Sequence, residues 1–199
     1  MKNPIRFLVI DGYTQEARNE LVAGGATMAA SLYVEMLTAC CPTEAVCDVI
    51  FPSDPGATLP EGVALTDFDA IAWTGCSLSI DDNEYPGIRS QLDLAEAAFA
   101  AGIPSFGTCW GIQIAIVAAG GRVQVHPGGR EMGVARKIQL TPEGRGHPLY
   151  AGKTTVFDGF ISHLDEVTHL PPGAVILAGN AFTRVQAACI THRKGTFWG

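Results

Sequence analysis

Short apolar runs alternate with longer amphipathic segments over the first 121 residues, and this alternation limits the possible folds more than any other feature of the sequence. Apolar runs that end at Gly or Pro predict buried strands, and segments with apolar residues at helical spacing predict helices. The expected strands are residues 5–13, 45–52, 67–75 and 103–106. The expected helices are residues 16–41, with a break at Gly24-Gly25, and residues 86–102 and 110–121. This order is typical of an α/β fold with a doubly wound, mostly parallel sheet flanked by helices.

From about residue 122 onward the pattern changes to short β-branched runs separated by Gly and Pro turns. We expect extra strands in this C-terminal third, some of them antiparallel. The runs are RVQVHP, ARKIQLT, TTVFDGF, AVILAGN and QAACITH. No internal repeat, low-complexity segment or linker divides the sequence, so we expect residues 1–199 to form a single domain.

The composition excludes several classes of partner. Hydrophobic residues make up 47% of the chain and charged residues 17%, which is typical of a globular protein with a substantial core. The net charge of −7 is spread over the chain without a basic cluster, so we expect no nucleic-acid partner. No apolar run approaches the roughly 20 residues that cross a bilayer, and the N-terminal segment lacks the pattern of a secretory signal. We therefore expect no membrane contact and a cytoplasmic location.

The cysteines and histidines do not form a metal or disulfide pattern. The six cysteines include no CxxC pair, and the five histidines show no metal-ligand spacing relative to them. We expect reduced thiols, five of them acting as small core residues and Cys109 as the exception. The acidic run at residues 81–84 precedes an expected helix and is interpreted as a solvated cap. No metal and no cofactor are predicted.

The exceptional cysteine lies in the stretch GIPSFGTCWGIQ, where an expected strand ends and an expected helix begins. A tight turn at this point would hold the Cys109 thiol out of the sheet, and the helix N-terminus would favour the thiolate. The backbone N–H of Trp110 could then stabilise an oxyanion. The same pattern also fits a buried core cysteine in a Gly-rich turn, so the turn alone does not decide between a nucleophile and a structural cysteine.

The stretch resembles the nucleophile turn of the class I (triad-type) glutamine amidotransferases, in which a glutamine follows the cysteine by four residues, as Gln113 does here. Further segments resemble that family in the same order along the chain: AWTGCSLS, GREMGVARKIQLT, FISHLDEV and ACITHRKGTFWG. The SHLDEV segment is most similar to the stand-alone, GMP-synthase-like amidotransferase domains. The resemblance implies the flavodoxin-like fold of this family.

The resemblance also implies a role for several residues. Cys109 would be the nucleophile, and the backbone N–H groups of Gly75 and Trp110 would form the oxyanion hole. The amino-acid end of the substrate would be held by Gln113, Ser162, Leu164 and Asp165. His163 is interpreted as a hydrogen-bonded loop residue and Glu131 as structural. The substrate would be glutamine or another γ-glutamyl compound.

The triad of this family also includes a His and a Glu in a His-Pro-Glu segment that follows Phe-(Trp/Tyr)-Gly. The sequence reaches Phe197-Trp198-Gly199 and ends there, so we expect the domain to be cut short just before that segment. His126, His147 and His192 are not excluded as substitutes by their distance in sequence, but no pattern favours them.

These observations lead to one main hypothesis and three alternatives. The main hypothesis is hydrolysis of a γ-glutamyl amide through a cysteine thioester, with ammonia released for a partner synthetase. The first alternative is a γ-glutamyl peptide hydrolase with the same fold. The second is a catalytically inactive, partner-binding homologue, which requires that the chain truly ends at Gly199. The third, a protein of the DJ-1/PfpI type, would place a histidine where Trp110 stands, which argues against it.

Overall fold

The structure, a computed structural model, describes residues 3–81 and 85–199. The strands are β1 (Ile5–Ile10), β2 (Ala45–Ile50), β3 (Ala70–Trp73), β4 (Ser105–Gly107), β5 (Arg122–Val125), β6 (Glu131–Leu140), β7 (Val156–His163), β8 (Asp165–His169), β9 (Ala174–Gly179), β10 (Ala187–His192) and β11 (Gly195–Trp198). The helices are α1 (Gln15–Ala23), α2 (Ala29–Cys40), α3 (Pro86–Ala101), α4 (Trp110–Ala118) and α5 (Pro142–Gly146), with short 3₁₀ turns at Leu65–Asp67 and Pro148–Tyr150.

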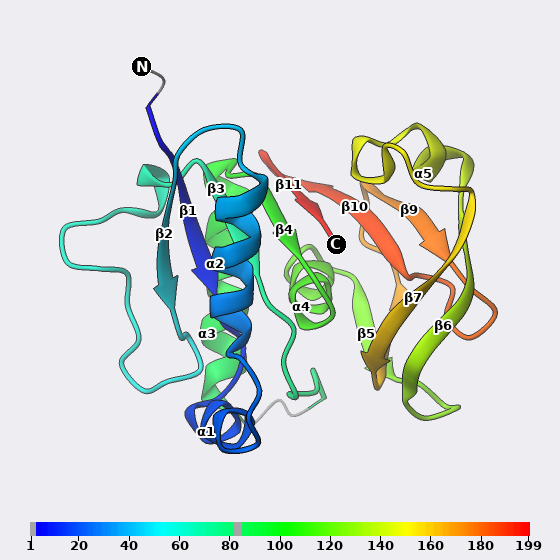
Figure 1. Cartoon of the computed structure of the whole chain (residues 1–199), viewed down its shortest axis with the longest axis horizontal. Helices are drawn as coiled ribbons and strands as arrows, with labels where there is room; N and C mark the ends of the chain where they lie inside the picture. Colours follow the sequence, from blue (N-terminus) through cyan, green and yellow to red (C-terminus); the bar gives the residue numbers. More distant parts are fainter. Residues whose placement is uncertain (1–2, 82–84) are drawn as a thin grey trace.

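One long sheet has the strand order β2-β1-β3-β4-β11-β10-β9-β6-β7, and β5 and β8 pair separately (Figure 1). The strands from β2 to β11 run parallel to their neighbours, and every pairing from β11 to β7 is antiparallel. The α/β fold class and the antiparallel strands of the C-terminal third are therefore confirmed. The expected break at Gly24-Gly25 separates α1 from α2. β8 was not predicted as a strand, and His163 is the last residue of β7 rather than a loop residue.

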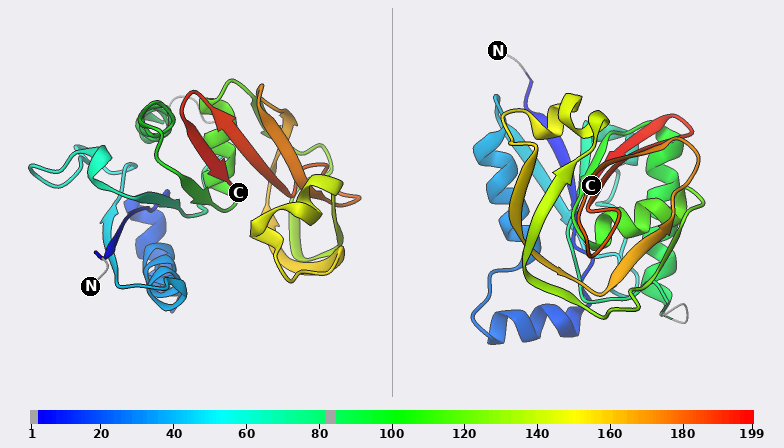
Figure 2. Two further views of the ribbon diagram at one scale, coloured as in Figure 1. Left: turned by 90° about the horizontal axis from the view of Figure 1, so that it is seen from above. Right: turned by 90° about the vertical axis from the view of Figure 1, so that its right-hand side faces the viewer.

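Helices cover both faces of the parallel strands, with α2 on one face and α3 and α4 on the other (Figures 1 and 2). Neighbouring residues of β1 show why. Leu8 belongs to the large apolar cluster that includes side chains of α3 and α4, whereas Val9 packs in a smaller cluster with Ala30 of α2. Successive side chains of a strand point to opposite faces, so an unbroken apolar run such as that of β1 requires cover on both sides.

The parallel register brings several strand ends to one edge of the sheet. Trp73 pairs with Gly107, and Trp198 pairs with Phe106, so the segments that follow β3, β4 and β11 leave the sheet side by side. Gly75, Cys109 and Gly199 stand just beyond these ends. Ligands of open α/β sheets bind outside the carboxyl ends of the strands, so this edge is the candidate ligand site.

Two other predictions concern membranes and the acidic run. Across residues 3–81 and 85–199, no helix combines the length and apolarity needed to cross a membrane. Most of the acidic run at 81–84 lies outside the described residues, so its prediction as a solvated cap stays a prediction.

Candidate active site

Cys109 occupies a sharp turn between β4 and α4. Its φ is 50° and its ψ is −105°, a backbone conformation that is strained for any residue other than glycine. Strain of this kind costs about 1–3 kcal/mol and is concentrated at functional sites. The predicted placement of the thiol at a strand-to-helix turn is confirmed.

Close packing explains the glycines that flank this turn. A Cβ at Gly107 would lie 2.7 Å from the Phe197 ring, and a Cβ at Gly111 would lie 2.7 Å from Cβ of Trp73. Gly75 faces the cysteine directly, since a Cβ there would lie 3.2 Å from Cβ of Cys109. The segment after β3 therefore packs against the turn that carries Cys109.

The Cys109 side chain is half-buried. Cys109 Sγ is 3.7 Å from the backbone oxygen of Ser162, across a separation of 53 residues in the chain. Burial raises the pKa of the Cys109 thiol above its usual value, and the Asp165 carboxylate raises this pKa further. The Trp110 N–H, the Arg130 charge and the Cys76 N–H lower it. The predicted effect of the helix N-terminus is thus present at Trp110, but burial outweighs it.

A cavity of about 510 Å³ opens beside Cys109. Gln113, Ser162 and Asp165 line it, so three of the residues predicted to bind substrate lie at the same cavity as Cys109. A smaller cavity of about 30 Å³ adjoins Cys109 and is lined by Leu164, Arg130 and the 76–79 segment. The indole of Trp110 points away, because its Nε1–H donates to Gln91 Oε1 at 2.8 Å, and only its backbone faces the thiol.

The Asp165 carboxylate holds two segments of the site together. It is buried and accepts hydrogen bonds from Ser79 Oγ at 2.9 Å and from the Ile80 N–H at 3.2 Å. The backbone oxygen of Leu164 accepts from the His126 N–H at 2.9 Å. The segment after β3 and the β7–β8 corner are therefore tied together on either side of Cys109.

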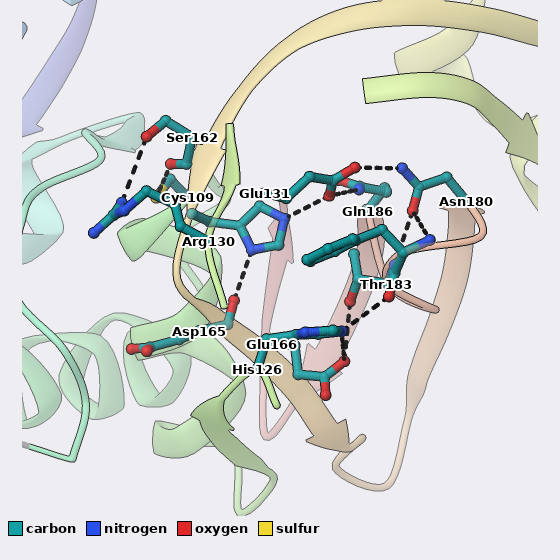
Figure 3. Close-up of polar contacts among 12 residues, drawn as sticks. Cys109, His126, Arg130, Glu131, Ser162, Asp165, Glu166, Asn180, Thr183 and Gln186 are labelled. Atoms are coloured by element: carbon teal, nitrogen blue, oxygen red, sulfur yellow. Dashed lines mark hydrogen bonds and ion pairs between the residues drawn. The ribbon is translucent and has the colours of Figure 1, made fainter. Parts of the chain in front are cut away.

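A polar network centred on Glu131 supports the β7–β8 corner (Figure 3). The Glu131 carboxylate accepts from His163 Nε2 at 3.0 Å, from Asn180 Nδ2 at 2.6 Å and from Gln186 Nε2 at 2.7 Å. His163 Nδ1 lies 2.8 Å from the backbone oxygen of Asp165. His163 thus links the Glu131 carboxylate of β6 to the first residue of β8. This arrangement agrees with the hydrogen-bonded role predicted for His163 and the structural role predicted for Glu131.

Sequence reasoning missed Arg130, Cys76, Asn180 and Gln186. Arg130 directly precedes the Glu131 position, and Figure 3 shows it beside Cys109 and Ser162. Its Nη1 lies 3.5 Å from Ser162 Oγ. Nothing in the local pattern distinguishes these side chains from other polar residues at strand ends.

Among residues 3–81 and 85–199, no histidine makes a hydrogen bond to Cys109. His126 bonds the Phe182 backbone oxygen and the Gly128 N–H, and His147 accepts from the Leu149 N–H. His169 contacts Thr168, and His192 packs edge-on against Phe99.

The remaining cysteines differ in how deeply they are buried. All six cysteines are free thiols; Cys47, Cys76 and Cys189 pack against the apolar clusters, whereas Cys40 is exposed and so is not the core residue that was predicted. No group of three or more His, Cys, Asp or Glu side chains within the described part of the chain is arranged to hold a metal ion.

The chain is similar in sequence to several known proteins. The family model "Glutamine amidotransferase class-I" matches residues 81–199. A γ-glutamyl-L-1-hydroxyisopropylamide hydrolase of Pseudomonas sp. is 40% identical over 98% of this chain and 65% of its own length. A glutamine-hydrolysing GMP synthase of Thermomicrobium roseum is 35% identical over 48% of this chain and 17% of its own length. This chain thus spans less than two thirds of either relative.

Solved structures show the same fold. A glutamine amidotransferase of Thermotoga maritima matches with a TM-score of 0.72 at 16% identity, over 99% of this chain and 75% of that one. A putative GMP synthase subunit of Thermoplasma acidophilum matches with a TM-score of 0.67 at 16% identity, over 100% of this chain and 84% of that one.

Proposed function

Because the chain belongs to the class I glutamine amidotransferase family, we propose that it hydrolyses a γ-glutamyl amide through a thioester on Cys109. The observation that carries this proposal is the strained turn that presents Cys109 to a cavity also lined by Gln113 and Ser162. A nucleophile held in this way, with backbone N–H groups beside it, has the geometry for acyl transfer.

The proposed reaction has two steps. The Cys109 thiolate attacks the amide carbon, the C–N bond breaks, and the amine leaves after accepting a proton. Water then attacks the thioester and releases the γ-carboxylate of glutamate and the thiol. We assign the oxyanion of both tetrahedral intermediates to the backbone N–H groups of Trp110 and Gly75. Gln113, Ser162, Leu164 and Asp165 would surround the amino-acid end.

The reaction also needs a group that takes the thiol proton, because burial raises the pKa of Cys109. The resemblance to the family places a His-Pro-Glu segment directly after the position of Gly199, and Gly199 lines the same cavity as Cys109. We assign proton transfer to that segment, in a polypeptide that carries it.

Two substrate classes fit this site. The Pseudomonas relative acts, by its name, on a γ-glutamyl amide with a substituted nitrogen, and its similarity covers 98% of this chain. We favour an N-substituted γ-glutamyl amide, because this similarity extends over nearly the whole chain, whereas that to the GMP synthase of Thermomicrobium roseum covers 48% of it. The second candidate is glutamine itself, with ammonia passed to a partner synthetase, which the GMP synthase relatives support.

The free thiols of the six cysteines favour a reducing, cytoplasmic location.

The test is glutamate release from γ-glutamyl isopropylamide and from glutamine by a purified polypeptide that carries the His-Pro-Glu segment. Cys109→Ala should lower the rate by about 10⁴-fold or more, as loss of a covalent nucleophile does in other enzymes. Cys40→Ala is the matched control, because that thiol is exposed and outside the cavity, and it should leave the rate unchanged. Equal glutamate release by wild type and Cys109→Ala would refute the proposal. A strong preference for glutamine would favour the second candidate.

A further inference from the structure

Arg130 is a cation beside Cys109 (Figure 3), and the proposed reaction gives it no role. It is exposed, it lines the small cavity with Cys109, Ser162 and Leu164, and its charge lowers the pKa of the Cys109 thiol. Its one hydrogen bond to a side chain within the described residues is the 3.5 Å contact with Ser162 Oγ. A guanidinium has five N–H donors, so most of them remain available to a ligand.

The acidic groups around the cavity are already engaged. Asp165 accepts from Ser79 and Ile80, Glu131 accepts from three side chains, and Glu166 accepts from Thr183 Oγ1 at 3.2 Å. A γ-glutamyl substrate carries a carboxylate on its α-carbon, four bonds from the reacting carbonyl carbon. A carboxylate that enters a site with several buried acids needs a cation as its partner.

On the basis of the proposed function, we propose that Arg130 binds the α-carboxylate of the γ-glutamyl group. The fork of its N–H donors matches the two oxygens of a carboxylate. Arg130 then restricts the substrate class to γ-glutamyl compounds with a free α-carboxylate, and it disfavours glutamine side chains inside peptides, whose α-carboxyl is an amide. Lys153 is the competing cation, because it lines the large cavity, whereas Arg130 lines the small one. Its Nζ lies 5.0 Å from the centre of the Phe157 ring.

The experiment compares two reagents that alkylate a glutaminase thiol. One is 6-diazo-5-oxo-L-norleucine, which has the α-carboxylate, and the other is 5-amino-1-diazopentan-2-one, which lacks it. The rate of Cys109 alkylation is followed by intact mass for wild type, Arg130→Gln, Lys153→Gln and Arg122→Gln. Arg122 is an exposed arginine that lines neither cavity and serves as the control for loss of charge. Alkylation by iodoacetamide and the melting temperature report whether each variant keeps a folded, accessible thiol.

The ratio of the two rates isolates the carboxylate, because a change in thiol pKa alters both rates alike. Arg130→Gln should lower the ratio about 10- to 100-fold, the size expected for a charge-assisted hydrogen bond. Arg122→Gln should leave it unchanged. An unchanged ratio in Arg130→Gln, or a lowered ratio only in Lys153→Gln, would overturn the assignment while the proposed function stands. If iodoacetamide labels wild-type Cys109 but neither diazoketone does, the glutamine pocket and this assignment both fail.

Discussion

Replacing Gly111 with alanine should destabilise the protein, because this glycine sets how closely α4 packs against β3. A Cβ at this position would lie 2.7 Å from Trp73 Cβ and 3.1 Å from the Trp73 backbone oxygen. Carbon atoms pack best at about 3.5–4.0 Å, so α4 would have to move by about 1 Å. Trp73 is 1% exposed. Because the two contacts are to its Cβ and its backbone oxygen, no change of side-chain rotamer would relieve them.

The size of the effect follows from two opposing contributions. Overpacking a core costs up to about 3 kcal/mol, and alanine regains about 1 kcal/mol over glycine inside a helix. The net loss is about 2 kcal/mol, which corresponds to a melting temperature lower by about 4–8 °C for a chain of this length.

The assay is thermal and urea unfolding followed by circular dichroism. Gly146→Ala is the matched control, since it lies at the end of α5, has no positive φ and has no atom within 4 Å of its added Cβ. That substitution should be neutral or stabilise by up to about 1 kcal/mol. A Gly111→Ala protein that melts at or above the wild-type temperature would refute the packing argument.

Three further predictions concern the site. Glu131→Gln replaces a carboxylate oxygen that accepts hydrogen bonds with an NH₂ group that donates. It should lower the free energy of unfolding by about 1–3 kcal/mol in urea titrations, because a buried donor then lacks its acceptor. Because burial raises the pKa of Cys109, the rate at which iodoacetamide alkylates this thiol should keep rising above pH 8.5, where the rate for an ordinary thiol begins to level off. Asp165→Asn should move this pH dependence to lower pH, because the Asp165 carboxylate raises the pKa of Cys109. Cys109→Gly should be more stable than Cys109→Ala by about 1 kcal/mol or more in the same urea titrations, since only glycine adopts φ 50° without strain.

Much of the fold could be predicted because local patterns agree with it. The apolar run of β1, and the Pro86 start and Gly102 end of α3, each indicate one element without reference to the rest of the chain. β8 could not be found in this way, because Asp165–His169 is a short and mostly polar segment. The insertion of β11 between β4 and β10 is likewise a property of long-range pairing, which periodicity does not record.

In the site, too, local sequence patterns indicate some residues, and long-range contacts determine the others. Cys109 was recognisable because a strand end, two glycines and a helix start surround it in sequence. Its contact with Ser162 could be expected only through the resemblance to a family, since it spans 53 residues. No such local pattern surrounds Arg130, Asn180 or Gln186, because each is simply a polar residue near a strand end. The contacts that their side chains make depend on how β6, β9 and β10 pack together.

The position of β11 has a consequence for the synthesis of the protein. Its Phe197 pairs with Ser105 of β4, so β4 gains its second neighbour from residues made about 90 positions later. Until residues 195–198 are made, β4 lacks this neighbour and would be an open sheet edge with Cys109 just beyond its end. Such edges are sites of misassociation. We expect ribosome-bound chains that have exposed Cys109 but not residue 195 to be alkylated by iodoacetamide faster than the finished protein. β11, made about 90 residues after β4, would then close the sheet edge next to which Cys109 lies.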